Sequence, residues 1–179
     1  MGPCRRSRFT LAVVAVALGL IGHYGGGQAE GADLRPGAWT FGAGLGFLGG
    51  TPDGTAFALN LNADAGLIEH LSLGPLVQLG FTGDSAQVGF SGQLKYWIDV
   101  PGTAKRLKVT PQVGLGFIHN SFLDGDTSWL IPLGAGADYA LNDAFHVTGT
   151  LLINFTNLDT GRPGGGADVM PGFTVGVRF

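Results

Sequence analysis

The sequence predicts an all-β protein: an eight-stranded antiparallel up-and-down transmembrane β-barrel, preceded by a cleaved signal peptide. Three observations predict this fold. Glycine supplies 33 of the 179 residues and charged residues only 13%, against roughly 7% and 25% in ordinary soluble domains. Apolar and polar residues alternate at period two over eight long segments, the pattern of strands with two unlike faces. Aromatic residues gather near the ends of these segments, as in the girdles of membrane barrels.

The amino-terminal region has the pattern of a secretory signal peptide. Arg5, Arg6 and Arg8 precede an uncharged apolar run over residues 9–22, and Gly27–Ala29 is a small-x-small cleavage pattern. The run is shorter than the ~20 residues that a spanning helix needs, which disfavours an uncleaved membrane anchor. We therefore expect a signal peptide over 1–29, a short segment over 30–37 and the barrel over 38–179.

The composition of the processed chain excludes several classes of protein. Its only cysteine, Cys4, lies within the signal peptide, so disulfides are not expected. Without Arg5, Arg6 and Arg8, seven Lys and Arg residues face thirteen Asp and Glu residues. No basic stripe is present, so nucleic acid is not an expected partner. A helical bundle is excluded because glycine costs about 1 kcal/mol relative to alanine at each helix position.

From residue 39 onward, eight segments alternate. They cover residues 39–47, 57–67, 71–81, 88–98, 107–117, 129–139, 145–155 and 169–179. In the first, Trp39, Phe41 and Leu45 share one face, whereas Gly42 and Gly44 share the other. The remaining segments repeat this division between an apolar face and a face of glycine, amide, hydroxyl and charged residues. We predict that the apolar faces contact lipid and that the other faces line the lumen.

Alternation alone also suits a soluble sandwich or a soluble ligand-binding barrel, but the segment lengths favour a membrane barrel. Transmembrane strands need ~9–11 residues, whereas strands of globular proteins average ~5–6. In an up-and-down threading, the aromatic residues form two belts. The loop-end belt holds Phe47, Phe57, Phe81, Phe90, Phe117, Trp129, Phe155 and Phe173, and the turn-end belt holds Trp39, Tyr96, Tyr139, Phe145 and Phe179. In lipid an open sheet edge has no water to bond, so we expect the first and last strands to pair.

The predicted connections differ in length. Those after the second and sixth segments are tight, and the link after the third is also short. The connections after the first, fifth and seventh segments are expected to be longer, glycine-rich and aspartate-rich loops. The link after the fourth, residues 99–106, is longer than a minimal turn.

Several short motifs resemble the OmpA/OmpX-like superfamily of small outer-membrane barrels over roughly residues 37–179. They are the turn and strand over 66–74, the Pro-x-x-Gly-x-Gly pattern over 111–116, its shorter variant over 132–136, and the terminal Phe173–Phe179. The resemblance implies an integral protein of the outer membrane of a Gram-negative-type bacterium, with outer-membrane lipid as a partner. It also implies insertion by the barrel-assembly machinery, which reads a carboxy-terminal signal formed here by Phe173, Val175, Val177 and Phe179.

The predicted lumen contains a cluster of charges in its turn-side half: Asp64, Lys95, Lys108, Asp138, His146 and Arg178. Buried charges need partners, so the favoured interpretation is a salt-bridged plug. The alternative is a narrow porin-like path for ions or small solutes, gated by this cluster. In that alternative the upper lumen is a polar vestibule lined by Asn60, Gln78, Ser91, Gln93, Gln112, Thr150 and Asn154. The many inward glycines leave some space in the lumen under either interpretation.

No catalytic residue is predicted. His119 and Ser121 have the His-x-Ser spacing of a lipid A deacylase-like barrel, but the mature glutamates, Glu30 and Glu69, lie far away in the threading. A calcium site at Asp124 and Asp126 lacks the full spacing of a calcium loop and is better explained as a solvated loop. We therefore predict no cofactor, no metal site and no enzymatic activity.

The sequence favours a monomeric barrel with a structural or surface-interaction role and a largely closed lumen. Three alternatives remain: a narrow pore for small solutes, an outer-face lipid A-modifying hydrolase and a soluble periplasmic ligand-binding barrel. The membrane-spanning interpretation requires that the Phe, Leu and Val side chains of the strands point outward.

Overall fold

The computed structural model describes residues 35–83, 85–121, 125–142, 144–159 and 166–179. The predicted signal peptide and most of the segment over 30–37 lie outside these residues. No helix in the described part of the chain is long and apolar enough to cross a membrane.

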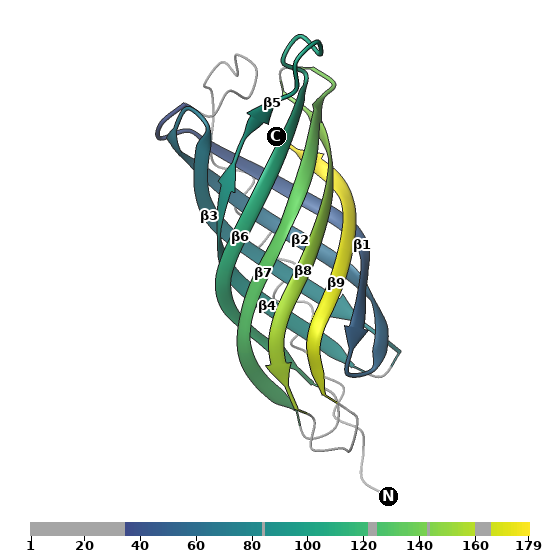
Figure 1. Ribbon diagram of the computed structural model, residues 1–179. Helices are drawn as coiled ribbons and strands as arrows, with labels where there is room; N and C mark the ends of the chain where they lie inside the picture. The colour runs from purple at the N-terminus through teal and green to yellow at the C-terminus, as the bar shows by residue number, and fades with distance from the viewer. Residues whose placement is uncertain (1–34, 84, 122–124, 143, 160–165) are drawn as a thin grey trace, which may run out of the picture.

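The described residues form one antiparallel sheet (Figure 1). Its strands are β1 (Trp39–Thr51), β2 (Gly54–Ile68), β3 (Leu71–Phe81), β4 (Ala86–Tyr96), β5 (Ile98–Asp99), β6 (Leu107–Asn120), β7 (Asp126–Ala140), β8 (His146–Leu158) and β9 (Ala167–Arg178). Trp97 alone separates β4 from β5, and both pair with β6, so the two act as one interrupted strand. Because β1 pairs with both β2 and β9, the sheet closes into the predicted eight-stranded barrel.

The strands are strongly staggered. Tracing paired residues from Gly44 through β2, β3, β4 and β6 leads to Ser128 on β7, whereas tracing them through β9 and β8 leads to Asp138. The two end points are ten residues apart on the same strand. This shear requires tilted strands, which are evident in Figure 1. An eight-stranded barrel of this kind has an interior that side chains can fill.

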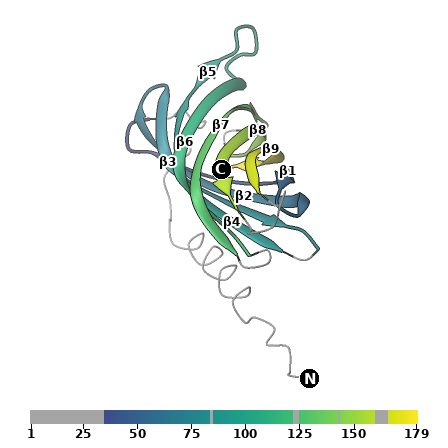
Figure 2. The ribbon, with the colours of Figure 1, turned by 60° about the horizontal axis from the view of Figure 1, so that its bottom comes forward.

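Both ends of the sheet, Trp39 and Phe179, lie at one rim of the barrel, here named the turn rim. The opposite end is named the loop rim. Connections at the loop rim span residues 52–53, 82–85, 121–125 and 159–166, and those at the turn rim span 69–70, 100–106 and 141–145. Thr51 pairs directly with Gly54, so the prediction of a long loop after the first strand is wrong. The hairpin of β5 and β6 instead projects from the turn rim (Figure 2).

The apolar faces of the strands point outward, as predicted. Leu115 is 70% exposed and Phe47 is 63% exposed, whereas polar residues such as Ser91 and Gln93 are fully buried in the lumen. Every aromatic residue assigned to the two belts is exposed on the outer surface. A soluble barrel would place this apolar surface inside, so the observed arrangement argues against the soluble ligand-binding alternative.

The inward glycines do not leave the space that the sequence suggested. A Cβ atom added at Gly46 would overlap the carbonyl oxygen of Phe173, and one added at Gly74 would overlap that of Ala63. At these positions glycine lets the backbones of neighbouring strands approach each other closely. The glycines therefore permit the strong curvature of the narrow barrel.

Candidate functional site

The turn half of the lumen contains a compact ionic cluster from three adjacent strands. The Asp138 carboxylate accepts hydrogen bonds from Arg178 Nε at 2.7 Å and Arg178 Nη2 at 2.9 Å. His146 Nδ1 lies 2.6 Å from the same carboxylate. All three side chains are at most 5% exposed. This bidentate geometry is the arrangement that compensates a buried arginine most fully.

Trp97 extends this cluster and was not predicted. Its indole ring lies 4.7 Å from the Arg178 guanidinium carbon, and its Nε1 donates to Ser72 Oγ at 2.9 Å. The sequence could have indicated its inward position, because Trp97 lies between the outward residues Tyr96 and Ile98. The large ring covers the guanidinium and fills the turn side of the lumen, where it is only 4% exposed.

A second ion pair lies deeper in the same half. Lys95 Nζ donates to Asp64 Oδ2 at 2.8 Å, and Asn62 Nδ2 donates to the same oxygen at 2.6 Å. The sixth predicted residue, Lys108, lies 3.6 Å from Asp99 Oδ1, an acid that the sequence did not assign to the lumen. The predicted cluster is therefore divided into three groups, each of which contains a carboxylate and at least one base.

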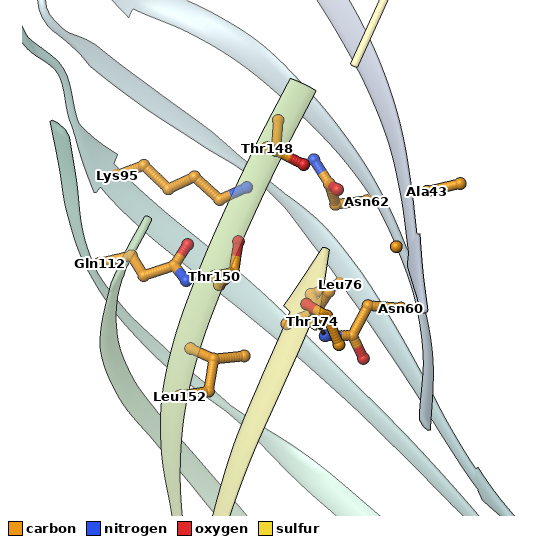
Figure 3. Close-up of a pocket in the computed structure, with 11 residues that line it drawn as sticks. Ala43, Asn60, Asn62, Leu76, Lys95, Gln112, Thr148, Thr150, Leu152 and Thr174 are labelled. Atoms are coloured by element: carbon orange, nitrogen blue, oxygen red, sulfur yellow. Dashed lines mark hydrogen bonds between the residues drawn. The ribbon is translucent and has the colours of Figure 1, made fainter. Parts of the chain in front are cut away.

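A small polar cavity occupies the middle of the lumen (Figure 3). Its volume is about 30 Å³, and its lining comprises Ala43, Gly44, Asn60, Asn62, Leu76, Lys95, Gln112, Thr148, Thr150, Leu152 and Thr174. Of the predicted vestibule, only Asn60, Gln112 and Thr150 line it. Two buried oxygens in this region, Asn60 Oδ1 and Asp64 Oδ1, accept no hydrogen bond from the described residues. The cavity has room for about two water molecules, which would satisfy such acceptors.

The loop half of the lumen contains an apolar cluster that was not predicted, beside buried uncharged polar residues such as Gln87 and Asn120. Buried residues on the inward faces pack into an apolar plug formed by Leu48, Ala56, Ala58, Ile118, Leu130, Leu158, Ala167 and Met170. Leu130 and Met170 are completely buried, and Ile118 is 1% exposed. The sequence could have indicated this cluster, because the period-two alternation continues past the polar residues of each inward face and places these apolar residues inward as well. Six of the seven residues of the predicted vestibule are at most 8% exposed, so they fill the lumen and do not line an open vestibule.

His119 and Ser121 do not form a nucleophile and its base. His119 Nδ1 lies 2.8 Å from Thr127 Oγ1, whereas Ser121 Oγ donates to the carbonyl oxygen of Ala86 at 2.9 Å. The amide nitrogen of Ala86 in turn donates to Ser121 Oγ at 3.0 Å. Among the described residues no carboxylate contacts His119. The serine hydroxyl therefore serves to hold two strand ends together.

The possible calcium loop gives no metal site among the described residues. Asp124 lies outside them, and the Asp126 carboxylate accepts hydrogen bonds from the amides of Thr127 and Asp159, both at 2.7 Å. No group of three or more His, Cys, Asp or Glu side chains in the described part of the chain could hold a metal ion. The Asp126 carboxylate instead links two strand ends at the loop rim.

The four residues of the predicted assembly signal lie on the outer face of the strand that closes the barrel. Phe173, Val175, Val177 and Phe179 are all exposed toward the surroundings of the barrel. The backbone of Phe179 exchanges hydrogen bonds with Phe41, at 2.8 and 2.9 Å. Recognition of this strand by the insertion machinery remains a prediction.

Comparison with known proteins relates the chain to membrane barrels by structure. No protein-family model matches the sequence, and no curated protein matches it. The crystal structure of Neisserial surface protein A (NspA) is similar with a TM-score of 0.56 at 16% identity, covering 78% of this chain and 94% of NspA. The N-terminal β-barrel domain of Pseudomonas aeruginosa OprF has a TM-score of 0.56 at 14% identity, covering 80% of this chain and 98% of that domain. By these likenesses and its closed sheet, the chain has the fold of the eight-stranded outer-membrane β-barrels.

Proposed function

We propose that this protein is an integral outer-membrane barrel with a closed lumen and a structural or surface-interaction role. The observation that carries the proposal is that side chains fill the lumen in both of its halves. The apolar plug and the buried uncharged polar residues beside it occupy the loop half, and Trp97 with the Asp138, His146 and Arg178 cluster occupies the turn half. Between them remains a cavity of about 30 Å³, too small for a solute larger than a few water molecules.

A surface role is supported by the outer face and the loop rim. The apolar outer face fits a lipid environment, so the remaining surfaces open to other molecules are the two rims. One of the similar structures is, by its name, a surface protein. For this chain we propose that the loop rim is the surface that contacts other molecules outside the membrane, and that the barrel serves as its anchor.

A narrow pore is the second candidate, favoured by the polar cavity and its unpartnered buried oxygens. Planar-bilayer recordings separate the two candidates. We expect the folded protein to give no discrete steady openings, because side chains fill both halves of the lumen and leave a cavity of only about 30 Å³ between them. Steady openings of nanosiemens size would overturn the proposal of a closed lumen.

A double variant sharpens this experiment. Leu130→Ala with Met170→Ala removes the bulk of the two completely buried side chains of the plug. We expect short openings of this variant above the silent wild type. If neither protein conducts while both are folded in the bilayer, the turn-side cluster is sufficient to close the lumen, which also agrees with the proposal.

An outer-face hydrolase is disfavoured by the bonding of Ser121, whose hydroxyl is held by the Ala86 backbone. Mass analysis of lipid A from cells expressing the wild type or Ser121→Ala provides the test. We expect identical lipid A in both. Loss of an acyl chain with the wild type but not with the variant would establish the hydrolase.

A further inference from the structure

The hairpin formed by β5 and β6 is the most prominent feature of the turn rim. It projects beyond the other connections at this rim (Figure 2). Val100 N donates to the carbonyl oxygen of Leu107 at 3.0 Å, and Arg106 N donates to that of Thr103 at 3.0 Å. Thr103 Oγ1 donates to the carbonyl oxygen of Val100 at 2.7 Å. The tip is therefore an ordered turn held by backbone and side-chain hydrogen bonds.

The tip exposes two adjacent cations, Lys105 and Arg106. Neither side chain makes an ion pair with any described residue, whereas the nearby Lys108 is paired with Asp99. The carbonyl oxygen of Arg106 accepts a hydrogen bond from Ala140 N at 2.8 Å, which fixes the tip against β7. Two unpaired positive charges are thus held at a fixed place on the rim.

The loop rim has the opposite charge among the described residues. Its charged side chains there are all acidic: Asp53, Asp126, Asp159 and Asp168. The turn rim carries the exposed acid Glu69 on another connection, but the hairpin tip presents the two cations together. A partner rich in phosphate would therefore be attracted to the hairpin tip and repelled from the loop rim.

The cations lie directly beyond the apolar belt of the barrel. Leu107 is the partner of the belt residue Tyr139, and the turn that holds Lys105 and Arg106 directly precedes Leu107 in the chain. Ile98 and Leu141 are exposed beside them. Cations at this height above an apolar belt lie at the level of lipid headgroups.

We propose that Lys105 and Arg106 form a binding site for the phosphate-bearing headgroups of anionic phospholipids in the leaflet at the turn rim. This inference rests on the proposed membrane-spanning placement and adds the class of lipid that the barrel selects. The apolar belt below the tip favours lipid over a soluble acidic partner, because only lipid supplies hydrocarbon and phosphate at adjacent heights.

Spin-labelled lipids test the proposal in phosphatidylcholine vesicles that contain the folded chain. The measured quantity is the ratio of association constants for labelled phosphatidylglycerol and labelled phosphatidylcholine. Each cation near an anionic surface contributes a preference on the order of fivefold at low salt. We expect a severalfold ratio for the wild type, a ratio near one for K105Q/R106Q, and a wild-type ratio for the charge-preserving control K105R/R106K. Added salt is expected to lower the wild-type ratio because it screens exposed charges.

Two results would overturn this inference. One is a wild-type ratio near one. If the wild type then binds soluble polyglutamate and K105Q/R106Q does not, the tip is assigned to a soluble acidic partner. The other is a double variant with an undiminished lipid preference. Failure of the underlying membrane placement is distinguishable, because the phosphatidylcholine label would then show no motionally restricted lipid at the protein surface.

Discussion

Buried charges lie in the turn half of the lumen, whereas the buried side chains of the loop half are uncharged, although the same strands line both. In the turn half, Asp138 and Asp64 are paired with buried bases. In the loop half, Leu130, Ile118 and Met170 pack without charge. A buried ion pair depends on each partner, because removal of one leaves an uncompensated charge. Apolar packing depends on volume and tolerates a change of partner more readily.

This difference explains how side chains of the strands alone can fill a narrow barrel. The charged half fixes the relative positions of β7, β8 and β9, since Asp138 binds Arg178 through two hydrogen bonds of defined direction. The apolar plug packs between the strands on the loop side without charge.

The largest expected effect is that of Asp138→Ala in the turn half. The variant leaves Arg178 and His146 buried without their carboxylate, which is expected to cost about 3–5 kcal/mol in the free energy of unfolding. Urea unfolding in lipid vesicles measures this loss. Asp168→Ala, an exposed acid at the loop rim, is the control and is expected to have little effect. A loss below about 1 kcal/mol for Asp138→Ala would contradict the importance of the ionic cluster.

Leu130→Ala tests the apolar plug in the same measurement. Its side chain is completely buried, and truncation of such a leucine costs about 2–5 kcal/mol, depending on how far the cavity collapses. This loss is expected to be insensitive to salt, because the substitution removes no charge. Leu115→Ala, on the exposed outer face, is the control, since its side chain makes no contribution to the plug. Equal losses for the two variants would show that the plug is loosely packed.

Leu115→Arg extends the comparison from the lumen to the outer face. An arginine on the lipid face near the midplane costs about 2–4 kcal/mol in a membrane barrel. Thr150→Ala, on the inward face, is expected to cost less. The same unfolding experiment provides both values, and an unchanged stability of Leu115→Arg would mean that this face does not contact hydrocarbon.

The smallest expected effect lies outside both halves, in the turn-rim hairpin. Ala104 has a φ of 50°, a left-handed conformation that is unfavourable for a residue with a Cβ atom. Ala104→Gly is therefore expected to increase the free energy of unfolding by about 1 kcal/mol. Gly102→Ala, at a φ of 84°, is the reverse control and is expected to lower it. A decrease for Ala104→Gly would contradict the assigned strain.

The strands and their outward faces could be predicted because period two is a local property of the sequence. The pairing of individual charges could not be predicted, since it depends on the registers of consecutive strands, for example of β7 with β8 and of β8 with β9. Asp138 and Arg178, for example, are 40 residues apart in the sequence. Trp97 and the apolar plug were accessible in principle, because both follow the inward alternation. They were missed because the inward face was expected to be polar throughout.

Cell fractionation with heat-modifiable gel mobility most directly tests the claim that the outer face contacts lipid. The processed chain is expected in the outer-membrane fraction, extracted only by detergent, with a folded form that migrates differently after boiling. Recovery of the processed, folded chain from the soluble periplasm without detergent would contradict the account.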